Sequence, residues 1–286
     1  LVPSGTLRLA LIVSLMEANR PEEALESFEG VREDMMGLSP GWYPLWAIHT
    51  EILHLLEEHE RELETAREGK GLIITPLHSL ALEARALAAL GEVDELQRVV
   101  AELLSAPPAP GTALGAVLTE LAGELLAHDR PAQATDVIET ALARLDAAPA
   151  ERSSSPESLE LRGRLLYLGA RWEEAREVFV ELAGTGPPSS TILGFRGVIA
   201  ARMGDSLTAR DSSRQLEDLE EPYQYGRKTL WRARIQAVLG NQAEATSLFR
   251  QAHGEGVGFG IWLHRDQDLA LLRGYSPFEE FIQPKG

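Results

Sequence analysis

The feature that most constrains the fold of this chain is a helical unit that returns at nearly constant intervals. A small or apolar residue opens the second helix of each unit, and successive openings lie 39, 33, 38, 41, 34 and 36 residues apart. The openings are Ala24, Leu63, Leu96, Ala134, Ala175, Ala209 and Ala245. Self-similarity at a period of about 34 residues is typical of stacked helix pairs, in which each pair buries its apolar face against its neighbours. The sequence therefore predicts a repeat array rather than one compact core.

Hydrophobic periodicity is helical along almost the whole chain. Segments such as "ALEARALAALG" (81–91) and "DELQRVVAELL" (94–104) place apolar residues three and four positions apart, and alternating strand-like runs are missing. Short turns such as "ANRPEEA" (18–24) and "MGDSLTA" (203–209) separate the two helices of a pair, and longer breaks separate the pairs. We therefore predict an all-α fold of about seven antiparallel helix pairs.

Small residues also recur twelve positions before the openings, within the first helix of the unit. They are Ala84, Ala122, Gly163, Gly197 and Ala233. A small side chain lets two helix backbones approach closely. Glycine costs about 1 kcal/mol relative to alanine inside a helix, so Gly163 and Gly197 indicate a packing requirement.

This combination of positions resembles the tetratricopeptide repeat family, over residues 20 to 255. The best copy carries Gly163, Ala175, Phe179 and Pro187. The other copies carry Gly197 with Ala209, Ala233 with Ala245 and Phe249, Ala84 with Pro108, and Ala24 with Phe28. The resemblance implies a right-handed α-solenoid, a superhelix in which the first helix of each pair lines a concave groove.

The end of the chain follows a different pattern. The stretch "GFGIWLHRDQDLALLRGYSPFEEFIQPKG" starts with a glycine-rich break and then places Leu269, Leu272, Phe278, Phe281 and Ile282 at helical spacing. It looks like the C-terminal segment that closes such arrays in large bacterial signalling and regulatory proteins. Because a terminal repeat must cover an open hydrophobic end, we expect a repeat array over 1–255 and a capping segment over 256–286, with the cap itself running from Asp266 to Ile282.

Charge and composition restrict the classes of partner. The net charge is -17, which disfavours binding to nucleic acid and to anionic membrane surfaces. The chain has no cysteine, which excludes disulfides, zinc-thiolate sites and thiol nucleophiles. No apolar run approaches the roughly 20 residues that span a bilayer, so we expect no membrane insertion. Lack of cysteine leaves cytoplasm and periplasm open, and the cytoplasm is the location we predict.

We find no catalytic or cofactor motif in the sequence. His49, His54 and His59 follow one another at five-residue intervals, which on a continuous helix separates their directions by about 140°. The glycine-rich "GEGVGFG" (254–260) follows a helix and lacks the lysine of a phosphate-binding loop. His264 belongs to the expected cap. We therefore expect no metal site, no cofactor and no enzymatic activity.

Arginine residues provide the candidate partner-binding site. In the family, the residue after the small packing position tends to face the groove, and an arginine fork binds carboxylates in a bidentate manner. The resemblance thus implies six groove candidates: Arg164, Arg234, Tyr167 and Arg202, with Arg227 and Arg85 as further members. A second set of arginines precedes the small position and is interpreted as pairing with acidic residues of neighbouring helices, such as Glu174, Asp211 or Glu244; this set is Arg162, Arg196 and Arg232.

Three functional hypotheses follow from these patterns. The leading one is a non-catalytic protein–protein interaction scaffold that binds a partner peptide or helix with acidic groups in the concave groove, in an oligomeric state that the sequence leaves open. The first alternative is the regulatory or sensory C-terminal region of a larger bacterial signalling protein, such as a kinase, a cyclase or a transcription regulator. It is motivated by the tail and by the opening "LVPSGT", which has no methionine. The second alternative is an enzyme that uses groove carboxylates.

Overall fold

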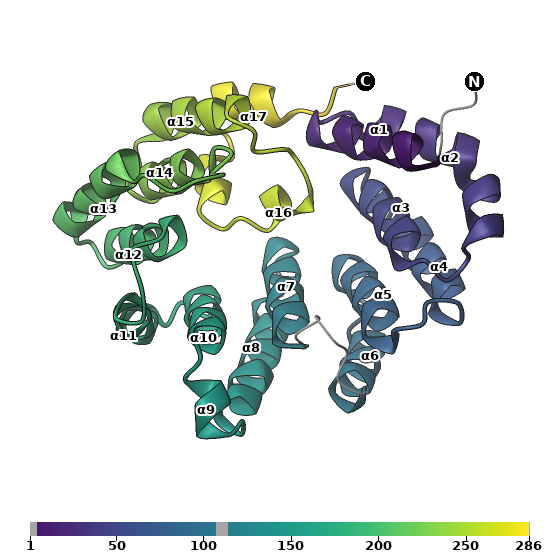
Figure 1. The fold of residues 1–286 in the computed structure, drawn as a ribbon, viewed down its shortest axis with the longest axis horizontal. Coiled ribbons are helices and arrows are strands. Elements are labelled where there is room, and N and C mark those ends of the chain that lie inside the picture. Colours follow the sequence, from purple (N-terminus) through teal and green to yellow (C-terminus); the bar gives the residue numbers. More distant parts are fainter. Residues whose placement is uncertain (1–4, 107–113, 286) are drawn as a thin grey trace. The chain divides into compact units, whose positions relative to one another are not determined.

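The computed structural model describes residues 5–106 and 114–285, and these residues form helices and no strand (Figure 1). The all-α class expected from the sequence is confirmed. Among the described helices, none combines the length and the apolar content that crossing a bilayer requires. Pro108, one of the residues that carry the family resemblance, lies outside the described residues.

The helices pack into two compact units. The first contains Leu1–Gln133, Gly258–His264 and Pro284–Gly286, and the second contains Ala134–Val257 and Arg265–Gln283. These units are defined by packing. The sequence-based division into a repeat array (1–255) and a capping segment (256–286) remains a prediction.

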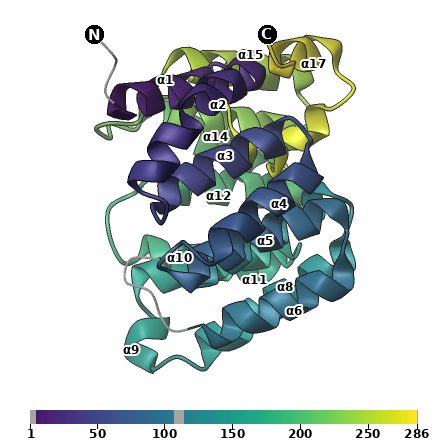
Figure 2. The same cartoon turned by 90° about the vertical axis from the view of Figure 1, so that its right-hand side faces the viewer.

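The first unit consists of helix hairpins that pack on one another. Its helices are α1 (Gly5–Glu17), α2 (Pro21–Leu38), α3 (Tyr43–Leu55), α4 (His59–Lys70), α5 (Pro76–Leu90), α6 (Val93–Ser105), α7 (Leu114–Ala127) and the short α16 (Ile261–His264). The hairpins pack through the pairs α2–α3, α3–α5, α4–α5 and α5–α7. Figure 2 shows α3, α4 and α5 lying side by side. The late segment joins this unit because Phe259 N–H donates to Glu17 O at 3.0 Å and because α16 packs on α3.

The second unit repeats the same hairpin. Its helices are α8 (Pro131–Asp146) from Ala134 onward, α9 (Ala150–Ser153), α10 (Pro156–Leu168), α11 (Trp172–Ala183), α12 (Ser190–Arg202), α13 (Ser206–Asp218), α14 (Arg227–Val238), α15 (Gln242–Gly254), the 3-10 helix η1 (Leu269–Leu272) and α17 (Ser276–Ile282). Side-chain caps fix several helix starts. Ser189 accepts the N–H of Ile192 at 3.3 Å, and Asp205 accepts the N–H of Thr208 at 3.0 Å.

The turn inside each hairpin contains one residue in the left-handed backbone region. These residues are Asn19, Glu57, Gly91, Asp129, Ala170, Gly204 and Gly240, with φ between 55° and 82°. Three of these residues are glycine. The other four have a side chain, which makes positive φ sterically unfavourable. Glu57 therefore marks the turn between α3 and α4, although the sequence there, "EEHERELETA", offers neither glycine nor proline.

Close packing explains the small residues of the first helices. A methyl group added to Gly163 would lie 2.6 Å from the Phe179 ring, and one added to Gly197 would lie 2.3 Å from Ile235 Cδ1. Ala175, which opens α11, is fully buried. The sequence-based prediction that these glycines meet a packing requirement is confirmed.

The chain from η1 to α17 covers apolar surface of α14 and α15. Leu269, Leu272 and Phe278 are buried. The Phe278 ring lies with its centroid 5.7 Å from that of Phe249, and η1 packs on α14. A capping segment would need this placement. That removing the segment destabilises the array remains a prediction.

Candidate functional site

Three of the six predicted groove residues lie on the first helices of the second unit and bind the chain's own acidic segment. Tyr167 is on α10, Arg202 ends α12 and Arg234 is on α14. Their partners are Asp266 and Asp268, which come just before η1. We call Tyr167, Arg202 and Arg234 the arginine–tyrosine face.

Asp268 is a buried carboxylate that accepts two side-chain hydrogen bonds from this face. Tyr167 Oη donates to Asp268 Oδ1 at 2.5 Å, and Arg202 Nη2 donates to the same oxygen at 2.7 Å. Burial and the neighbouring Asp266 raise the pKa of Asp268, and its contacts with Tyr167 and Arg202 oppose this rise. Burial and Asp268 together raise the pKa of Tyr167 well above its usual range, so this phenol stays a hydrogen-bond donor.

Asp266 joins the same face to the backbone of η1. Arg234 Nε donates to Asp266 Oδ2 at 2.5 Å, while Asp266 Oδ1 accepts the N–H groups of Asp268 and Leu269, each at 3.0 Å. The Arg234 guanidinium also lies 4.5 Å from the Trp231 ring centroid, a cation–π distance. Three consecutive first helices thus hold the two carboxylates of the turn that precedes η1.

The other three predicted residues lie in different surroundings. Arg164 has a side chain that is 45% exposed, binds Glu160 at 2.5 Å and lies 5.7 Å from the Phe195 ring centroid. Arg227 is exposed at the start of α14. Arg85, on α5 of the first unit, is largely covered and donates from Nε to Glu62 Oε1 at 2.6 Å. Arg164 and Arg227 are therefore the members of the predicted set with accessible side chains.

The arginines interpreted as stacking residues pair with acidic groups of adjacent helices in the second unit. Arg196 binds Asp211 at 3.6 Å, as expected from the sequence. Arg162 binds Asp146, and Arg232 binds Glu217 at 3.1 Å. The partners suggested for these two, Glu174 and Glu244, lie instead against Arg171 and Gln236.

A second polar group lies in the first unit, around the fully buried Glu62 of α4. Glu62 Oε1 accepts from Arg85, and Glu62 Oε2 lies 2.8 Å from His54 Nδ1 and 3.4 Å from His59 Nδ1. Burial alone would raise the pKa of Glu62, but Arg85 and the two histidines outweigh it and lower the pKa to about 2. Glu62 is therefore a buried carboxylate that stays ionised at any physiological pH.

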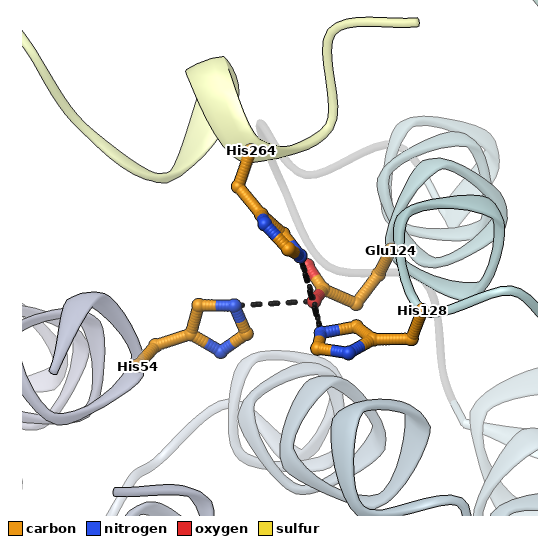
Figure 3. Close-up of side chains that lie close together, drawn as sticks. All are labelled: His54, Glu124, His128 and His264. Atoms are coloured by element: carbon orange, nitrogen blue, oxygen red, sulfur yellow. Dashed lines mark hydrogen bonds and ion pairs between the residues drawn. The ribbon is translucent and has the colours of Figure 1, made fainter. Parts of the chain in front are cut away.

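The opposite nitrogen of His54 faces a group of ligand-type side chains that the sequence did not bring together. His54 Nε2 lies 3.1 Å from Glu124 Oε1, and His128 Nε2 lies 2.9 Å from the same oxygen. His264 Nε2 lies 3.2 Å from His128 Nε2 (Figure 3). In the described part of the chain, these four residues and the triplet His54, His59 and Glu62 are the groups whose donor atoms lie close enough to hold a metal ion.

The expectation that these histidines point apart was wrong for His54 and His59, because it assumed one continuous helix, whereas it holds for His49 and His54, which both lie on α3. α3 ends at Leu55 and α4 begins at His59, with the left-handed Glu57 between them. The chain therefore reverses direction, and the rings of His54 and His59 come to lie with centroids 4.8 Å apart. The pair His54 and His264 is separated by most of the sequence, so no local spacing could have indicated it.

Comparisons with known proteins find similar solved structures at low sequence identity, two of which are described below. No protein-family model and no curated protein matches the chain. A tetratricopeptide repeat protein from Parabacteroides merdae is 14% identical over 93% of this chain and 98% of that chain, with a TM-score of 0.48. The structure of Naa15/Naa10 bound to HypK-THB is 15% identical over 98% of this chain and 39% of that chain, with a TM-score of 0.34. The tetratricopeptide-like fold is therefore assigned from the chain's own hairpins and small-residue contacts.

Proposed function

We propose that this chain is a non-catalytic helical-repeat scaffold that binds a partner peptide or helix with acidic groups. The observation that carries the proposal is the arginine–tyrosine face, where side chains from α10, α12 and α14 already hold two carboxylates of an acidic turn. A surface that binds its own acidic segment in this way has the donors needed to bind another one. The cytoplasmic location stays a prediction from the sequence.

Within this proposal the six candidate residues have different roles. Arg164 and Arg227 contact the partner directly, because their side chains are accessible. Tyr167, Arg202 and Arg234 bind the internal segment, so a partner reaches them only by displacing Asp266 and Asp268. The remaining candidate is Arg85. It forms an ion pair with the buried Glu62 and contacts the partner least.

Affinity capture from a lysate of the organism that encodes the chain tests the proposal. We expect the double variant Arg164→Glu, Arg227→Glu to lose partners that the wild type retains, because charge reversal repels an acidic segment. The matched control is Arg176→Glu, Arg214→Glu. These arginines lie on the second helices α11 and α13, with side chains 53% and 69% exposed.

The control should retain the partners, and all proteins should melt at similar temperatures because exposed ion pairs contribute little to stability. Retention of the same partners by both double variants would contradict the assigned groove contacts. A wild type that retains no protein above the level of an unrelated bait would contradict the scaffold function.

A further inference from the structure

Three histidines and one glutamate converge inside the first unit. His54 is on α3, Glu124 on α7, His128 directly after α7, and His264 at the end of α16 (Figure 3). One ligand atom from each lies within 4.8 Å of all the others. The side chains of His54 and Glu124 are 3% and 0% exposed, and those of His128 and His264 are 18% and 32% exposed. The cluster is therefore buried on one side and reachable from solvent on the other.

His54 is held in place by Glu62. Glu62 Oε2 lies 2.8 Å from Nδ1 of His54, so Nε2 is the ring nitrogen that points into the cluster. A buried carboxylate behind an imidazole is the usual outer partner of a metal-bound histidine, because it fixes the tautomer and the ring direction.

Four ligand atoms then face one another at the centre of the cluster. His54 Nε2 lies 3.1 Å from Glu124 Oε1, and His128 Nε2 and His264 Nε2 are 3.2 Å apart. A single bound cation could be ligated by all four groups at once.

The spacing of the ligand atoms fits a tetrahedral ion. Metal–ligand bonds of about 2.0 to 2.1 Å place ligand atoms about 3.3 Å apart in a tetrahedron. The contacts of Glu124 Oε1 with His128, His54 and His264 are 2.9, 3.1 and 3.9 Å long. All of the ligand atoms lie within 4.8 Å of one another.

We propose that His54, Glu124, His128 and His264 form a zinc-binding site, with Glu62 as the outer partner of His54. Three imidazole nitrogens and one carboxylate oxygen are ligands of Zn²⁺, whereas Ca²⁺ and Mg²⁺ prefer oxygen ligands throughout. Such an ion joins the late segment 258–264 to α3 and α7, which are far from it in sequence. The site is independent of the proposed partner binding, and it differs from the sequence-based expectation that the chain holds no metal.

Calorimetric titration of Zn²⁺ into the full chain, purified without a histidine tag and stripped with a chelator, tests the site. We expect one ion per chain. His264→Gln and His128→Gln each remove one ligand and should weaken binding at least about 100-fold, because loss of an outer partner alone costs 10- to 100-fold. His78→Gln is the control. It replaces a histidine of the same unit that stacks on Tyr43, outside the cluster, and should bind as the wild type does.

Cobalt provides a second readout that does not depend on affinity alone. Co²⁺ bound by the wild type should show the strong visible absorption of a four-coordinate ion, and His264→Gln should lose it. His264 is the most accessible of the four side chains, so this variant keeps the fold, which circular dichroism checks. Absence of stoichiometric Zn²⁺ binding by the wild type would overturn the proposal. Equal affinity in wild type, His264→Gln and His128→Gln would overturn it as well.

Discussion

The close approach of α12 to α14 at Gly197 gives a prediction that can be worked out in detail. In Gly197→Ala the new methyl carbon would lie 2.3 Å from Ile235 Cδ1, 2.8 Å from Ile235 Cγ1 and 3.1 Å from Ser212 Cβ. Ile235 is fully buried, so its side chain has no open space into which to retreat. The substitution therefore forces the two helices apart or Ile235 out of its rotamer.

Two terms of opposite sign set the magnitude. Overpacking a core by one methyl group costs about 1 to 3 kcal/mol. Alanine gains about 1 kcal/mol over glycine in a helix interior. We expect Gly197→Ala to lower the free energy of unfolding by about 0 to 2 kcal/mol, the sum of these terms.

Two further variants separate the terms. Gly30→Ala is the control, because Gly30 lies within α2 and a methyl group there meets nothing within 4 Å. It should gain stability from helix propensity alone. Gly197→Ala combined with Ile235→Val moves one methyl group from residue 235 to residue 197 and removes the nearest clashing atom. Ile235→Val alone should lower the free energy of unfolding by about 0.5 to 1.5 kcal/mol. The double variant should lose less unfolding free energy than the sum of the losses of the two single variants.

Urea denaturation followed by circular dichroism measures these differences, and hydrogen exchange of the α12 and α14 amides reports the second unit by itself. A coupling of at least about 1 kcal/mol between residues 197 and 235 is expected for side chains in direct contact. Strict additivity would refute the reasoning, and so would a Gly197→Ala protein that gains as much stability as Gly30→Ala does.

The remaining predictions concern a buried histidine and the C-terminal segment. His49 stacks on Phe28 with centroids 4.6 Å apart, and burial, Arg32 and Arg61 lower its pKa from 6.5 to about 4. The unfolded chain then binds more protons between these values, so stability falls by up to about 3 kcal/mol as the pH drops from 6.5 to 4. His49→Leu should flatten this part of the urea-midpoint profile, and an unchanged slope would show that other groups cause it. Phe278→Ala should cost about 3 to 5 kcal/mol and increase binding of a hydrophobic dye; wild-type stability would contradict the capping role.

The repeat was readable from the sequence because it rests on local constraints. Helix propensity, apolar periodicity and short turns act over a few residues, so they leave a regular signal in the chain. The packing of one helix on the next also left a signal, since Gly163 and Gly197 recur at the same place in their units. The left-handed Glu57 was not predictable in this way, because a charged residue at positive φ carries no turn signature.

What the sequence by itself determined is the all-α class, the helix pairs and the small residues through which they pack. The family resemblance also placed Tyr167, Arg202 and Arg234 among the candidate groove residues. Tertiary structure alone decided what these residues bind, since Asp266 and Asp268 reach them from a segment outside the repeat frame.

The histidine cluster shows the same limit more sharply. His54, Glu124, His128 and His264 meet only because α3, α7 with the residue after it, and α16 come together in the first unit. Contacts across such long sequence separations depend on the path of the whole chain and leave no local pattern. The sequence therefore fixes the repeating framework, and the tertiary structure decides which distant side chains become a site.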